Sequence, residues 1–127
     1  MEQMTNDGYY DAIRAKIPEL DYQMGLTTCV GDKDFYLELL NDFTELPIKD
    51  ELDRFLKAAD SKNYCICVHG FKNNAYSVGA KAIGDLAYEL EKITKEGTFE
   101  QVLQVQTHMF ELYDSVCRRF HETEVLP

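Results

Sequence analysis

The sequence predicts an all-α fold, an antiparallel up-down four-helix bundle with one or two short N-terminal helices. Apolar residues recur in steps of three and four along most of the chain, and no segment alternates with period two for long enough to require a strand. Turn-forming residues divide this pattern into four long amphipathic stretches. Because the connections between them are short, consecutive helices must run in opposite directions.

The composition indicates one compact domain. The 127 residues, 45% of them hydrophobic, suffice for one core; we divide them into an N-terminal extension with a short helix (1–19) and the bundle (20–127). The formal net charge of -10 argues against nucleic acid or an anionic membrane as partner, because Lys and Arg bind both. Since we find no secretory leader pattern and no apolar run near the roughly 20 residues of a membrane span, we expect a cytoplasmic protein.

The four cysteines, Cys29, Cys65, Cys67 and Cys117, give no zinc or redox-dithiol pattern. They include no C-x-x-C pair, and thiols two residues apart in a helix point to different sides. We therefore expect small buried thiols and no metal site. Because the bundle uses every apolar stripe, we also expect a monomer.

Two short helices are expected before the bundle. Residues 8–17 have helical apolar spacing between Asp7, the expected N-cap, and Pro18, which stops a helix. Asp21 begins a second short helix, and residues 30–32 form a turn.

The first long helix is expected to run from Asp32, its N-cap, to about Ala59. Pro47 lies inside this stretch, lacks an N–H and leaves the carbonyl of Phe43 without its helical partner. We therefore predict one helix with a kink, at a cost of about 3 kcal/mol. Its apolar residues are Phe35, Leu39, Phe43, Leu46, Leu52, Phe55 and Leu56.

Glycine turns separate the other three long helices. They are expected at residues 63–78, at 80–96, and from Thr98, the N-cap, to about His121. Positive φ is predicted at Gly79 and at Gly97, each at a helix C-terminus. The residues expected to face inward are Tyr64, Val68, Phe71, Ala75 and Val78, then Ile83, Leu86, Ala87, Leu90 and Ile93, then Phe99, Val102, Leu103, Met109, Phe110, Tyr113, Val116 and Phe120.

A polar stripe lies beside the buried stripe of residues 63–78. His69, Lys72, Asn73 and Tyr76 follow one another at spacings of three and four, so they share one face of a rigid helix. His69 is thus presented from the middle of a helix, which suits a group that meets a partner.

The turn at Gly79 supplies a residue that orients the histidine. Counting equally far into the next helix places Glu91 near His69. A carboxylate that accepts Nδ1–H would fix the tautomer and leave Nε2 unprotonated and nucleophilic. Lys72, one turn along, would hold the negative charge of a phosphoryl group.

Residues 69–80, HGFKNNAYSVGA, resemble the signature of histidine-containing phosphotransfer (HPt) domains, in which H-x-[LF]-K-G-[ST]-[SA] precedes an apolar residue and Gly-Ala. Residues 86–91, LAYELE, are similar to the family's second helix, and residues 20–43 are similar to its first helices. The resemblance spans roughly residues 20–121, so it implies that the bundle is an HPt domain.

The resemblance implies that His69 accepts a phosphoryl group, that Lys72 supports this group and that Glu91 holds the imidazole. The group would pass from an aspartyl phosphate of one receiver domain to His69 Nε2, and then to the aspartate of another receiver. The implied partners are response-regulator receiver domains and a hybrid histidine kinase. Because Mg²⁺ belongs to the receiver, this chain would need no cofactor and would be a phosphocarrier, not an enzyme.

The sequence departs from the family pattern beside the histidine. Asn73 stands where glycine is usual, which adds bulk, and Asn74 stands where Ser or Thr is usual. Gly70 restores some clearance at about 1 kcal/mol of helix propensity. The residues expected to meet the partner are Gly70, Asn73, Asn74, Tyr76 and Tyr88, and Tyr36, Tyr76 and Tyr88 would add an aromatic docking patch.

A second interpretation keeps the bundle without the chemistry. The chain would then be an HPt-like binding module that docks a receiver or a histidine kinase and is not phosphorylated, which Asn73 and Asn74 would favour. His108 and His121 are expected to be incidental, because thirteen residues on one helix separate them too far to bind one metal ion.

Overall fold

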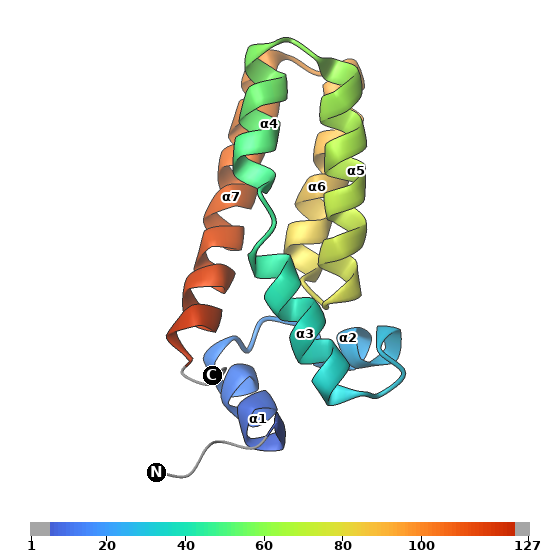
Figure 1. Ribbon diagram of the computed structural model, residues 1–127. Coiled ribbons are helices and arrows are strands. Elements are labelled where there is room, and N and C mark those ends of the chain that lie inside the picture. Colours follow the sequence, from blue (N-terminus) through green and yellow to red (C-terminus); the bar gives the residue numbers. More distant parts are fainter. Residues whose placement is uncertain (1–5, 124–127) are drawn as a thin grey trace.

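The computed structural model describes residues 6–123, and within this range the chain forms seven α-helices and no strand, which confirms the all-α prediction (Figure 1). None of the described helices combines the length and the apolar character needed to cross a bilayer. The helices are α1 (Asn6–Lys16), α2 (Tyr22–Thr28), α3 (Lys33–Thr44), α4 (Ile48–Lys57), α5 (Ser61–Ser77), α6 (Lys81–Glu96) and α7 (Phe99–Glu122).

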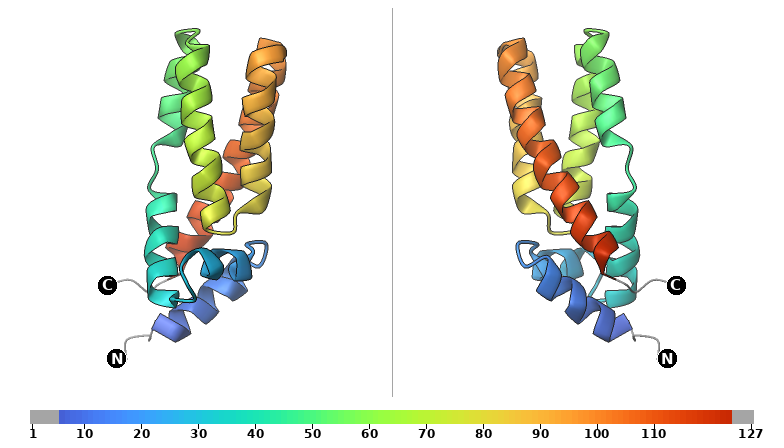
Figure 2. Two further views of the ribbon diagram at one scale, coloured as in Figure 1. Left: turned by 90° about the vertical axis from the view of Figure 1, so that its right-hand side faces the viewer. Right: turned by 90° about the vertical axis from the view of Figure 1, so that its left-hand side faces the viewer.

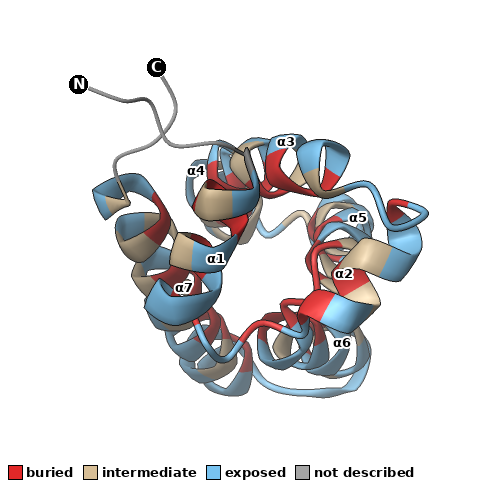
Figure 3. Cartoon of the chain, turned by 90° about the horizontal axis from the view of Figure 1, so that it is seen from below, coloured by how far each residue is buried: buried red, intermediate tan, exposed pale blue. Residues whose placement is uncertain are grey.

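The four C-terminal helices lie lengthwise beside one another, and α1 and α2 cross one end of them (Figures 1 and 2). The closest pairing is between α5 and α6; α6 packs also against α7, and α4 against α5. Seen from below, the buried residues of the surrounding helices face a common interior (Figure 3). The paired helices α5 and α6 carry the predicted polar stripe and Glu91.

One hydrophobic core includes the N-terminal helix. Tyr9 and Ile13 of α1, and Ile17 just after it, are buried in the same cluster as residues of α5, α6 and α7. The Tyr9 ring stacks on Phe120 of α7 at 6.4 Å between centroids. The described part of the N-terminal extension, residues 6–19, therefore contributes to the core. The inward stripe predicted for residues 63–78 is confirmed, because Tyr64, Val68, Phe71 and Ala75 of α5 and its C-cap Val78 are all buried.

Three predicted N-caps are present. The side chains of Asp21, Asp32 and Thr98 each accept a hydrogen bond from the backbone N–H three residues on, at 3.0, 3.1 and 3.2 Å. The predicted cap at Asp7 is wrong, because α1 begins at Asn6 and includes Asp7. The Asp7 carboxylate instead lies 3.4 Å from the ammonium of Lys33, at the start of α3.

The predicted kink at Pro47 is a complete break. Helix α3 ends at Thr44 and α4 begins at Ile48, so the prediction of one long helix is wrong. The carbonyl of Phe43, which Pro47 cannot serve, accepts a hydrogen bond of 2.6 Å from the Tyr113 hydroxyl of α7. This distant partner satisfies the freed carbonyl and thereby stabilises the break.

The two glycine turns differ. Gly79 has φ +79°, as predicted, but Gly97 has φ -99° and ψ -175°, which is extended backbone, so the prediction of a left-handed Gly97 is wrong. Thr98 explains the difference, because its capping box requires the chain to enter α7 in an extended conformation.

The cysteines are free thiols. Cys29 is buried, whereas Cys65, Cys67 and Cys117 are half-buried, so the prediction of buried thiols holds fully only for Cys29. Burial and the neighbouring carboxylate of Glu51 raise the pKa of the Cys67 thiol to about 12. Within residues 6–123, no group of three or more His, Cys, Asp and Glu side chains is arranged to hold a metal ion.

Candidate functional site

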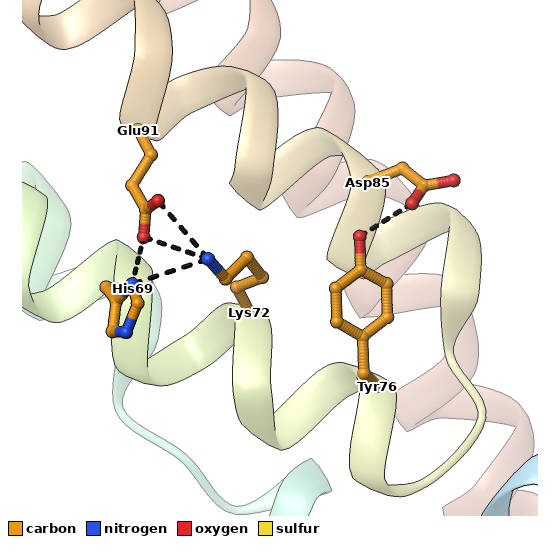
Figure 4. A network of polar contacts seen from close by, with 5 residues as sticks. All are labelled: His69, Lys72, Tyr76, Asp85 and Glu91. Atoms are coloured by element: carbon orange, nitrogen blue, oxygen red, sulfur yellow. Dashed lines mark hydrogen bonds and ion pairs between the residues drawn. The ribbon is translucent and has the colours of Figure 1, made fainter.

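The turn between α5 and α6 sets the register of the site. Its amides bond back into α5, with Gly79 N–H donating to the Tyr76 carbonyl at 3.0 Å and Ala80 N–H donating to the Ala75 carbonyl at 2.8 Å. The two helices then lie side by side, and the polar stripe of α5 meets the matching face of α6 (Figure 4). Residues from both helices therefore form one network.

His69 is held at one ring nitrogen and open at the other. Its Nδ1 contacts Glu91 Oε1, the contact predicted from the register of the hairpin. The other ring nitrogen points away from Glu91 and Lys72 (Figure 4), and 58% of the His69 side chain is exposed. With Nδ1–H donated to the carboxylate, Nε2 keeps a lone pair that a partner can reach.

Lys72 lies on the Nδ1 side of the imidazole. Its Nζ is 3.3 Å from Glu91 Oε1, 3.2 Å from Glu91 Oε2 and 3.3 Å from His69 Nδ1. Because the proton of Nδ1 is directed at Glu91, the ammonium donates to the carboxylate and only approaches the ring. Only 13% of the Lys72 side chain is exposed. In this state Lys72 neutralises Glu91 and does not face Nε2.

Glu91 is a shared acceptor for both partners. Its side chain is 18% exposed, and burial alone would raise the pKa of the carboxyl group. The hydrogen bonds of His69 and Lys72 and the charge of Lys72 outweigh burial, so the pKa of Glu91 is lowered. Glu91 is therefore an ionised carboxylate near neutral pH and keeps its hold on the imidazole.

Tyr76 is fixed against α6 two turns from His69. Its hydroxyl donates a hydrogen bond of 2.6 Å to Asp85 Oδ1 (Figure 4). Its ring covers Gly84, where an added Cβ would lie 2.6 Å from Tyr76 Cδ1. Burial and the Asp85 carboxylate raise the pKa of Tyr76 to about 12, so the phenol stays protonated.

The other predicted partner-binding residues lie at the surface of α5 and α6, with the exception of Tyr36. Gly70, Asn73 and Asn74 are exposed on α5, and Tyr88 is 49% exposed on α6. Tyr36 does not join them: it is fully buried, and its hydroxyl donates to the Val78 carbonyl at 2.8 Å. The prediction that Tyr36 forms part of a docking patch is therefore wrong.

A groove between α4 and α5, which was not predicted from the sequence, adjoins the histidine. It has a volume of about 340 Å³, and Gly70, next to His69, lies in its wall. Ile66, three residues before His69, is 60% exposed at the groove. In the sequence, this groove could have been suspected from Ile66, because it is an apolar residue that lies off the buried stripe of α5. The lining residues are Leu46, Pro47, Ile48, Glu51, Phe55, Asn63, Ile66, Cys67, Gly70, Phe71 and Asn74.

The other two histidines lie outside this network. His121 Nε2 is 3.1 Å from Glu45 Oε1 and 3.3 Å from Thr44 Oγ1, at the junction of α3 and α7. His108 is exposed on α7. Among the three histidines, His69 alone combines a carboxylate at Nδ1 with an open Nε2.

Comparison with known proteins adds no relative. The chain has no significant match to a protein-family model, a curated protein or a solved structure. What can be said of function therefore depends on the motif and on the geometry of His69, Lys72 and Glu91.

Proposed function

We propose that this chain is a histidine phosphotransfer protein, built as an antiparallel four-helix bundle, that carries phosphoryl groups between receiver domains in a two-component phosphorelay. The observation that carries the proposal is the contact of Glu91 with His69 Nδ1, which leaves Nε2 nucleophilic and exposed. The protein would work in the cytoplasm as a monomer, downstream of a hybrid histidine kinase. It would carry the group without being an enzyme.

The proposed transfer needs only one nucleophile from this chain. The Nε2 lone pair of His69 attacks the phosphorus of the receiver's aspartyl phosphate, an N–P bond forms, and the bond from phosphorus to the aspartate oxygen breaks with the carboxylate as leaving group. The Nδ1 proton stays on the ring, and Glu91 balances the positive charge that develops there. The receiver supplies Mg²⁺. Attack by the next receiver's aspartate reverses these steps.

The charge distribution around His69 supports an acidic partner. Although the chain has 23 Asp and Glu residues, none lies between Asp60 and Asp85, a stretch that includes all of α5. The acidic pocket of a receiver and its phosphoryl group would thus meet α5 without like charges on that helix. Glu91 does not oppose this approach, because it is mostly covered and paired with Lys72.

The test is phosphoryl uptake by the purified chain from a receiver labelled with ³²P, in the presence of Mg²⁺. We expect a labelled chain whose label is lost in acid and retained in alkali, as for phosphohistidine, and which returns the label to an unphosphorylated receiver. A panel of receivers is needed, because the receiver that this chain recognises is not identified and other receivers would not transfer the label. Absence of label from every receiver, together with binding that survives His69→Ala, would favour the alternative of a docking module without phosphorylation.

Gly70→Ala separates the needs of the helix from those of the partner. An added Cβ meets no atom within 4 Å, so the variant should gain up to about 1 kcal/mol of unfolding free energy, measured in urea, from helix propensity. Uptake of the phosphoryl group should slow, because the new methyl group stands beside His69 at the groove. Faster or unchanged uptake in the stabilised variant would show that Gly70 is not kept for docking.

A further inference from the structure

The ammonium of Lys72 is confined although its hydrogen bonds are weak. The distances of 3.2 and 3.3 Å to Glu91 exceed the 2.7–2.9 Å typical of a close charge-assisted bond. A lysine on a helix surface normally keeps its flexible side chain in water. At 13% exposure, Lys72 is instead well covered, so a second group must hold it.

The ring of Tyr88 lies on the ammonium. Lys72 Nζ is 5.3 Å from the centroid of this ring, within the range of a cation–π interaction. Tyr88 and Glu91 are three residues apart on α6, so they face α5 together, one turn apart. Lys92 Nζ lies 5.0 Å from the same ring. The Tyr88 ring is therefore within cation–π range of two ammonium groups.

We propose that Tyr88 is a positioning residue that holds the Lys72 ammonium against Glu91, on the Nδ1 side of His69. The ring limits the positions open to the lysine, and the lysine in turn keeps the carboxylate charged and aligned on Nδ1. Tyr88 thus acts on His69 through Lys72 and Glu91. From the sequence, Tyr88 is expected only at the partner surface, and the resemblance of residues 86–91 to the family's second helix assigns no positioning role to it.

The test compares Tyr88→Leu with Tyr88→Phe in the resting protein. Leucine removes the ring, whereas phenylalanine keeps it and loses only the hydroxyl. We expect the pKa of Glu91, followed by ¹³C NMR of its carboxyl carbon, to rise in Tyr88→Leu and in Lys72→Met and to stay unchanged in Tyr88→Phe, because the lysine charge lowers this pKa. Lys92→Met is the matched control. It removes the other ammonium from the Tyr88 ring and should leave the pKa of Glu91 unchanged.

A double variant shows whether Tyr88 acts through Lys72. In the Lys72→Met background, Tyr88→Leu should add no further change to the titration of Glu91. Additive effects, a titration unchanged by Tyr88→Leu, or equal effects of Tyr88→Phe and Tyr88→Leu would each overturn the proposal. Circular dichroism should show an unchanged helix content, because Tyr88 is half exposed.

The consequence for the reaction rests on the proposed function, whereas the titration does not. Tyr88→Leu should slow phosphoryl uptake about threefold, and Tyr88→Phe should restore the rate. If the unaltered chain takes up no phosphoryl group, the proposed function fails, and the Glu91 titration still supports or overturns the positioning role of Tyr88.

Discussion

Replacing His69 by glutamine is expected to reduce phosphoryl uptake to background. Glutamine has a similar size and polarity, but its side-chain amide has no nucleophilic nitrogen lone pair at the position of Nε2. The fold should survive, because the His69 side chain is more than half exposed and Glu91 retains Lys72. The measurement is transfer of ³²P from a phosphorylated receiver, with urea unfolding as the check on stability.

His108→Gln and His121→Gln are the matched controls for this experiment. Both should take up label at the rate of the unaltered chain, since His108 lies on α7 outside the network and His121 Nε2 is occupied by Glu45 and Thr44. Equal labelling of His69→Gln and the unaltered chain would refute the assignment of His69. If either control lost the label instead, the phosphoacceptor would be that histidine of α7 and not His69.

Three helix starts could be predicted from capping residues, which act within one turn of the chain. An Asp or Thr N-cap acts on an amide three residues away, so Asp21, Asp32 and Thr98 could be identified without any tertiary contact. Pro47 shows the limit. The missing N–H was evident, but the Tyr113 hydroxyl, which donates to the Phe43 carbonyl at the break, belongs to a helix far along the chain.

Hydrophobic periodicity predicted the buried face of α5, but it did not predict how far neighbouring helices cover each apolar residue. On α3 the predicted stripe is partly wrong, because Phe35 is 49% exposed whereas Leu37 and Leu40 are buried. Phe99 and Leu103 continue the inward stripe of α7, yet both are exposed at the beginning of that helix.

Tyr36 is the converse case. It stood off the predicted stripe, but Tyr10 and Tyr22 pack against its ring with centroids 6.2 and 5.9 Å away, and it is buried. Coverage is a property of the packed helices and has no local sequence signal.

The sequence predicted that Glu91 contacts His69, but it did not predict where the Lys72 side chain lies. Counting from the Gly79 turn brought Glu91 to His69, because an α-helical hairpin has a fixed rise per residue. The side of the imidazole on which Lys72 lies could not be counted, since a lysine side chain reaches several positions from one backbone site. Glu91 and Tyr88 decide between these positions in space.

Gly79→Ala is expected to give the largest loss of stability, about 2–5 kcal/mol in unfolding free energy. An alanine at φ +79° costs about 1–2 kcal/mol in the left-handed region. In addition, its Cβ would lie 2.7 Å from the carbonyl carbon of Asp21 and closer still to the oxygen, and overpacking against backbone costs a further 1–3 kcal/mol, roughly. Urea unfolding measures the sum.

Gly31→Ala separates the two costs. Gly31 has φ +77°, nearly the value of Gly79, but an added Cβ there meets no atom within 4 Å. This variant should therefore lose only the backbone cost, about 1–2 kcal/mol. The difference between the variants measures the clash of the added Cβ with the backbone of Asp21, whose N–H donates to the Gly79 carbonyl at 2.8 Å and joins α2 to the hairpin. Equal losses in both variants would mean that α2 yields to the added methyl group, and that the turn holding Glu91 to His69 does not depend on this contact.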